Sequence, residues 1–131
     1  MKNIILIISA IFVCQTAFAQ PAMDEAFKSY SENGKLKFDA KRGQALWIKK
    51  FPDKTGKDRQ CTTCHGQDLT KSGKHAKSGK IIEAMAPSAN NTRYTKLKKI
   101  NKWFKRNCKW TLGRECTNQE KGDILKYLSQ Q

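Results

Sequence analysis

The sequence predicts a small all-α domain. Apolar residues recur every three or four positions in several segments, which is the spacing of a helix with one buried face. No stretch of useful length alternates apolar and polar residues as a half-buried strand does. The chain after an N-terminal apolar leader has about 110 residues, enough for one domain with a marginal core of its own. A large apolar group bound inside would strengthen that core.

The leader, residues 1–19, has the composition of a cleaved secretory signal peptide. Lys2 supplies a positive charge, Ile4 to Val13 is apolar except for a serine, and positions 17–19 read Ala-Phe-Ala, a small-x-small cleavage site. The apolar stretch is too short to span a bilayer comfortably. Cys14 follows Val13 where a lipid-attachment site requires a small residue, which disfavours a lipoprotein. We therefore expect an exported, periplasmic domain over residues 20–131.

The first two helices are expected before residue 51. One spans about 24–30 and carries Phe27 and Tyr30 three positions apart. The next begins near Asp39, a suitable N-cap, and runs to about residue 50. Gly43 lies within it and would allow another helix to cross closely.

Two more helices are expected in the last third of the chain. The third spans about 95–108 and has an apolar stripe at three- and four-residue spacing, formed by Leu97, Ile100, Trp103 and Phe104. The fourth follows a T-x-x-E capping box at 117–120. The segments 52–60 and 66–80 between the two pairs are polar and rich in charge, so we expect them to be connections.

The most specific motif is C-x-x-C-H at Cys61, Cys64 and His65. Two thiols at this spacing can each form a thioether with one porphyrin, and the following histidine then supplies the proximal imidazole to the iron. A zinc site would need a second cysteine pair at similar spacing, and a thioredoxin-like redox pair would need βαβ patterning. The sequence has neither. The motif therefore predicts one covalently attached haem c.

The remaining cysteines of the exported chain are Cys108 and Cys116. Two cysteines remain once Cys14 is removed with the signal peptide and Cys61 and Cys64 are attached to haem. In an oxidising compartment such a remainder is expected to pair as a disulfide.

The chain is strongly basic, with 26 Lys and Arg against 11 Asp and Glu and a formal net charge of +15. Nucleic acid is the first partner that such a charge suggests. An exported protein seldom meets nucleic acid, and the sequence has no motif of a nucleic-acid module, so we expect no such partner. Two interpretations stay open: electrostatic steering toward an acidic redox partner, and a solvated surface on which no single lysine matters.

The function of a monohaem protein depends on the ligand opposite the proximal histidine. Met85 is one candidate, because a thioether opposite imidazole is the ordinary electron-transfer arrangement. His75 lies in a polar, lysine-rich stretch typical of an exposed histidine, and Met23 precedes the core. Asn107 continues the apolar stripe of the third expected helix, which would point its amide toward the haem or toward another hydrogen-bond partner.

Four segments resemble the sphaeroides haem protein (SHP) family. They read C-T-T-C-H-G at 61–66, M-A-P-S-A at 85–89, K-W-F-K-R-N-C at 102–108 and L-G-R-E-C-T at 112–117. The resemblance extends over about residues 43–128. It implies a class I cytochrome c-like helical fold around one haem, bound through Cys61, Cys64 and the proximal ligand His65. It also implies Asn107 as the distal ligand and a Cys108–Cys116 disulfide.

The same resemblance implies a function. The protein would be a high-spin periplasmic cytochrome that accepts electrons from a dihaem cytochrome c and a membrane cytochrome b. Its asparagine ligand would dissociate on reduction, so that a diatomic molecule such as O2 or NO can bind or be reduced. The alternative is a six-coordinate His/Met electron carrier that uses Met85 and performs no small-molecule chemistry. We expect a monomer in either case.

Overall fold

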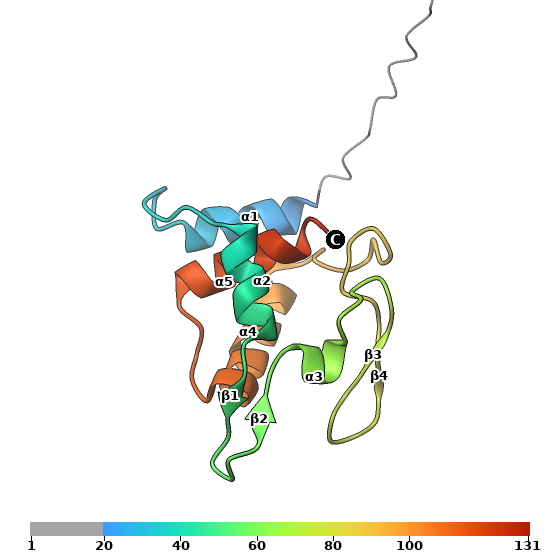
Figure 1. Ribbon diagram of the computed structural model, residues 1–131. Coiled ribbons are helices and arrows are strands. Elements are labelled where there is room, and N and C mark those ends of the chain that lie inside the picture. The colour runs from blue at the N-terminus through green and yellow to red at the C-terminus, as the bar shows by residue number, and fades with distance from the viewer. Residues whose placement is uncertain (1–19) are drawn as a thin grey trace, which may run out of the picture.

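The computed structural model describes residues 20–131, and its architecture is built from helices, as predicted (Figure 1). Two small antiparallel ladders, each of two-residue strands, interrupt the helices between residues 51 and 82. In chain order the elements are α1 Pro21–Tyr30, α2 Ala40–Ile48, β1 Phe51–Pro52, β2 Asp58–Arg59, α3 Thr62–His65, β3 Gly73–Lys74, β4 Ile81–Ile82, α4 Leu97–Leu112 and α5 Asn118–Leu128. The expected signal peptide and Cys14 lie outside the described residues. No helix within 20–131 has the length and apolar character needed to cross a bilayer.

The helix boundaries differ from the predicted ones at identifiable residues. α1 begins at Pro21, before the predicted start, because proline suits the first turn of a helix, where its missing N–H is not needed. α2 ends at Ile48 because Lys49 is extended and leads into β1. α4 continues beyond the predicted end to Leu112 and stops at Gly113, whose φ of 74° is the left-handed conformation that ends many helices.

The crossing of α2 and α5 brings two backbones into direct contact (Figure 1). A Cβ atom on Gly43 would lie 2.0 Å from the carbonyl oxygen of Asp123 and 2.9 Å from Cβ of Tyr127. No side chain can occupy that space. The expectation that Gly43 permits a close crossing is therefore confirmed.

Asp123 stabilises the same crossing with a buried carboxylate. Its side chain accepts hydrogen bonds from the backbone N–H of Asp39 at 2.7 Å and from the Arg42 guanidinium at 2.8 Å. Asp39 in turn caps α2 by accepting from the Arg42 N–H. A buried carboxylate needs such partners to offset its lost hydration. The predicted capping box at Thr117 and Glu120 is present at the start of α5.

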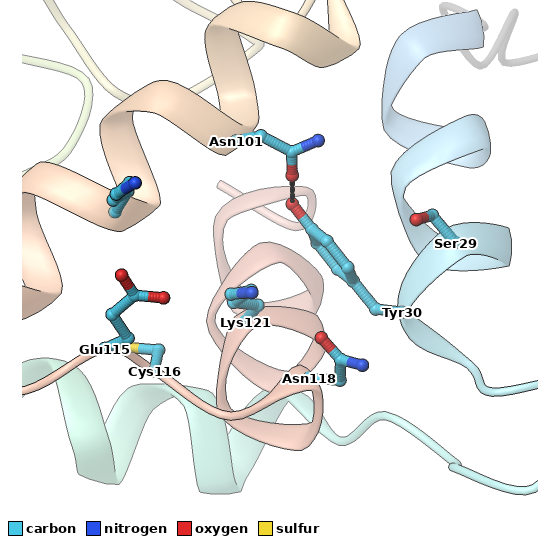
Figure 2. Close-up of a pocket in the computed structure, with 8 residues that line it drawn as sticks. Ser29, Tyr30, Asn101, Glu115, Cys116, Asn118 and Lys121 are labelled. Atoms are coloured by element: carbon cyan, nitrogen blue, oxygen red, sulfur yellow. Dashed lines mark hydrogen bonds between the residues drawn. The ribbon is translucent and has the colours of Figure 1, made fainter.

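Two clusters of buried side chains form the core. The first lies among α2, α4, α5 and the loops that follow α3 and β4. It contains Trp47, Leu69, Met85, Ala86, Cys108, Cys116, Ile124 and Leu128. The second joins α1 to α4 and α5, and contains Ala22, Met23, Ala26, Tyr30, Ile100 and Leu125. Figure 2 shows Tyr30 donating its hydroxyl hydrogen to the carboxamide oxygen of Asn101, which ties α1 to α4 beside a polar surface cavity of about 340 Å³.

Candidate haem site

The C-x-x-C-H motif forms a single helical turn, α3, with Cys61 at its N-cap. The backbone N–H of Cys64 and of His65 both donate to the carbonyl of Cys61, at 3.3 and 3.2 Å. Residues three apart on a helix lie on neighbouring positions of one side. Both thiols are half-buried and outside any disulfide. The turn therefore presents two thiols and one imidazole from five consecutive residues.

The turn is held from outside by β3. A Cβ atom on Gly73 would lie 2.1 Å from the carbonyl oxygen of Cys64 and 2.8 Å from Cα of His65. The Ala76 N–H also lies 3.4 Å from the Cys64 sulfur. The sequence indicated only a connection over residues 66–80, because a contact with a segment nine residues away leaves no periodic signal.

His65 lies in an apolar environment beside α2. Its ring centroid is 5.3 Å from that of Trp47, and burial, with a smaller contribution from the Arg93 charge, lowers the pKa of His65 to about 4. A neutral imidazole is the form that binds iron. Nδ1 of His65 and Nε1 of Trp47 are both buried and lack a hydrogen-bond partner among the described residues.

Arg59 connects the haem motif to the C-terminal half of α4. Its guanidinium donates to the Trp110 carbonyl at 2.9 Å, lies 4.8 Å from the Trp110 ring centroid, and pairs with Asp53 at 2.8 Å. Cys61, two residues after Arg59, packs against the same cluster as Cys108. These contacts bring Cys61 toward the part of α4 that carries Asn107. Nothing in the sequence singled out Arg59.

Asn107 interrupts the buried face of α4. Ile100, seven residues earlier, and Thr111, four residues later, lie on the same side of the helix and are buried. Asn107 lies between them but is exposed, and no hydrogen bond to its carboxamide occurs among residues 20–131. Trp103, one turn earlier, is 44 % exposed. This side of α4 therefore presents an exposed carboxamide and a partly exposed aromatic ring that lies beside the Arg106 guanidinium.

The predicted disulfide between Cys108 and Cys116 is present. It joins α4, directly after Asn107, to the segment that leads into α5. Both cysteines are buried in the first cluster. The helix position of Asn107 is thereby held on its C-terminal side by a covalent link.

Met85 lies in the first cluster and is 9 % exposed. Its N–H donates to the Leu69 carbonyl at 2.9 Å, and its own carbonyl accepts from the Tyr94 hydroxyl at 2.8 Å. Tyr94 has a φ of 56°, a left-handed conformation that costs a non-glycine residue about 1 kcal/mol or more. The Arg93 guanidinium donates to the carbonyls of Glu83 and Ala84. The backbone at Met85 is therefore held firmly.

The other two candidate ligands lie in different surroundings. His75 is exposed in the loop between β3 and β4, where its Nδ1 accepts from the Ser78 N–H at 3.1 Å. Met23 belongs to the second cluster, with α1. Neither shares the first cluster with Cys61.

The residues in this region fit a covalently bound haem. Cys61 and Cys64 would form the thioethers, and the neutral His65 imidazole would bind iron on one side. Asn107 or Met85 would face the other side. The buried Trp47 N–H is available to a haem propionate, which would satisfy a group that otherwise lacks an acceptor.

Comparison with known proteins gives consistent matches. A family described as a domain of unknown function, DUF1924, matches residues 33–128. The chain is 35 % identical to the cytochrome c-type protein SHP of Cereibacter sphaeroides over 126 residues, which cover 96 % of this chain and 97 % of that protein. The structure of oxidised SHP, described as an oxygen-binding cytochrome c, matches with a TM-score of 0.73 and 37 % identity, over 83 % of this chain and 96 % of the other. The solution structure of cytochrome c'' from Methylophilus methylotrophus, reported for what it shows of haem-ligand detachment, matches with a TM-score of 0.71 and 25 % identity, over 83 % of this chain and 93 % of the other.

Proposed function

Because this chain belongs to the SHP family of c-type cytochromes, with haem c as its cofactor, we propose that it is a periplasmic protein in which Asn107 is a labile distal ligand. Residues 1–19 would be the cleaved signal peptide and residues 20–131 the cytochrome domain. Its function would be to accept electrons from a dihaem cytochrome c and a membrane cytochrome b, and to bind or reduce a diatomic molecule. SHP is itself described as oxygen-binding, which supports O2 as one such molecule.

The observation that carries this proposal is the exposed, unbonded carboxamide of Asn107 on the side of α4 that carries the buried Ile100 and Thr111. A carboxamide left without a partner in a buried environment is costly, so a ligand or an iron is a reasonable partner for it once haem covers this face. The disulfide beside Asn107 limits how far the amide can move.

The chemistry of the side chains supports His65 as the proximal ligand and Asn107 as the labile distal ligand. Haem c, when bound, supplies an iron that changes by one electron and can hold a small diatomic molecule. His65, through a neutral imidazole, holds it from the proximal side. The Asn107 amide oxygen is a weak, hard donor suited to the oxidised iron and poorly suited to the reduced one. After release, its NH2 group can donate a hydrogen bond to a small ligand in the same space.

A specific observation favours the alternative, in which Met85 binds the iron and the protein only carries electrons. Met85 shares the first cluster with Cys61, and its backbone is held by Leu69 and Tyr94. The same position is also compatible with a methionine that only packs against the porphyrin.

Spectra of three variants of the haem-loaded protein separate the two functions. We expect the oxidised wild type to show high-spin charge-transfer absorption, and the reduced protein to bind carbon monoxide. Asn107→Ala should change the ferric spectrum, whereas Met85→Ala and the control Asn101→Ala, a carboxamide on the same helix, should leave it as in the wild type. A low-spin spectrum with a near-infrared sulfur–iron band, lost only in Met85→Ala, would refute the proposal.

A further inference from the structure

The outer side of α4 carries positive charge that its own helix does not balance. Between Leu97 and Leu112 the helix has six basic residues and no acidic one. Four of them are exposed and make neither an ion pair nor a cation–π contact with a described residue. We call these four the cationic face: Lys98, Lys99, Lys102 and Lys105.

The other two basic residues of α4 have partners. Lys109 pairs with Glu115 at 3.2 Å, and the Arg106 guanidinium lies 5.3 Å from the Trp103 ring centroid. The cationic face is therefore the part of the helix whose charge is left for another molecule. Three of its members, Lys98, Lys102 and Lys105, are displaced by about half a turn from the buried Ile100, whereas Lys99 is displaced by about a quarter of a turn.

This arrangement is unfavourable for the helix itself. Like charges three or four positions apart repel, as they do between Lys98 and Lys102 and between Lys102 and Lys105. Lys98 and Lys99 also lie in the first turn, where the helix dipole disfavours positive charge. No side chain caps this end of α4.

Two neighbouring helices, α1 and α5, follow the dipole rule. α1 has Asp24 in its first turn and Lys28 in its last, and α5 has Glu120 in its first turn and Lys126 in its last. α2 also has two basic residues in its first turn, but the carboxylate of its N-cap Asp39 caps that end. α4 has Lys98 and Lys99 in its first turn and neither an acidic residue nor a side-chain cap there. A charge pattern that costs the helix stability is more simply explained by a contact with something acidic than by folding.

We propose that the cationic face of α4 is the docking surface for an acidic electron-donor protein. This inference rests on the proposed function, and it names the surface through which the electron arrives. The donor loses one electron and the haem iron gains it, so no other reactant is required. Asn107 lies on the other side of the same helix, and a helix with its side chains is about 10–12 Å thick, so the donor would dock within one helix of the candidate distal residue.

A protein partner fits this surface better than a membrane does. A helix that lies in a bilayer interface needs an exposed apolar side beside its basic one. Most of the apolar side of α4 is instead packed into both clusters through Ile100, Phe104 and Cys108. Trp103 is the one large apolar side chain of α4 that is exposed, and one ring does not make an apolar side. Charge complementarity with an acidic protein, in contrast, needs no apolar area to raise the association rate.

The test compares two variants that remove the same number of charges. The first carries Lys98→Gln, Lys99→Gln, Lys102→Gln and Lys105→Gln. The control changes four exposed lysines outside α4 that also make no ion pair, one between β1 and β2 and three between the start of β3 and β4: Lys54→Gln, Lys74→Gln, Lys77→Gln and Lys80→Gln. Glutamine is nearly as good a helix former as lysine, so the α4 variant should fold. The control lysines are exposed and outside the helices, where substitutions usually change stability little.

The probe is an acidic flavodoxin, used reduced for electron transfer to the ferric protein and oxidised for binding by titration calorimetry. At low ionic strength we expect the α4 variant to be reduced at least about ten times more slowly than the wild type, with a matching loss of binding. The reduction rate of the control variant should differ from that of the wild type by less than about threefold. The salt dependence of the rate should weaken mainly in the α4 variant.

Three outcomes would overturn the proposal. Equal losses in both variants would show that net charge alone matters, and a larger loss in the control would move the docking surface to the loops. Binding to phosphatidylglycerol vesicles that depends on the α4 lysines, without an effect on flavodoxin, would point to a membrane instead. Carbon monoxide binding by the reduced variants, measured in parallel, reports on the proposed function separately, since removing these lysines leaves His65, Asn107 and Met85 unchanged.

Discussion

Gly43→Ala should open the α2–α5 crossing on which the fold depends. The added Cβ would lie 2.0 Å from the Asp123 carbonyl oxygen, whereas carbon and oxygen in contact stay about 3.3 Å apart, so the helices must separate by about 1 Å. The Asp123 carbonyl oxygen belongs to the backbone and cannot rotate away as a side chain could. The destabilisation by overpacking should therefore be at the upper end of its usual range, about 3 kcal/mol. Alanine regains about 1 kcal/mol in helix propensity. We therefore expect a net loss of about 2 kcal/mol.

Denaturant unfolding of the holoprotein, followed by far-ultraviolet circular dichroism, measures this loss. Gln44→Ala is the matched control, because it is the next position on α2, it is exposed, and its change should stay within about 0.5 kcal/mol. The variant should also alter the near-ultraviolet signal of Trp47, which lies one turn after Gly43 and packs beside His65. An unchanged or raised stability in Gly43→Ala would show that the crossing is not as close as the geometry indicates.

Three further perturbations test other parts of the structure. Replacing Cys108 and Cys116 together by serine should lower the free energy of unfolding by about 2–3 kcal/mol, because a short loop is no longer closed in the unfolded chain. Denaturant unfolding with and without a reducing agent measures this loss. The wild type in reducing agent must lose the same free energy as the double variant. Trp47→Phe keeps most of the apolar ring but removes the buried N–H, so the propionate bending modes in the resonance Raman spectrum should shift; an unchanged spectrum would mean that this N–H does not reach a propionate. Burial raises the pKa of Tyr30 to about 12 in the folded protein, against about 10 when it is unfolded. Because the unfolded tyrosine then loses its proton first, stability should fall as the pH rises from about 10 to 12, and should fall less steeply in Tyr30→Phe.

The parts of the site that could be predicted are those encoded over a few consecutive residues. The C-x-x-C-H motif needs only one helical turn to present two thiols and an imidazole, so its sequence suffices. The capping box at Thr117 and Glu120 is likewise local. The Cys108–Cys116 pair spans a short loop, and the number of cysteines left it a single partner.

The contacts that position this motif could not be predicted, because they join segments with no periodic relation. Arg59 bonds to Trp110, 51 residues away, and Gly73 packs against Cys64 only because β3 folds back over α3. The Arg93 charge near His65 also depends on how the loop around residue 90 returns to the core. Each contact requires the packed structure before the two residues can meet.

The sequence by itself determined four of the five helices between residues 20 and 131, the covalent attachment of a haem and the register that puts Asn107 on the same side of its helix as Ile100. These follow from spacing, since a 3.6-residue period and a three-residue separation of thiols are properties of one short segment. Only the tertiary structure decided which candidate ligands share a cluster with Cys61, which lysines of α4 lack an ion-pair partner, and how closely α2 and α5 cross. Burial and charge pairing depend on every segment packed against a residue, so the segment that carries the residue cannot specify them alone.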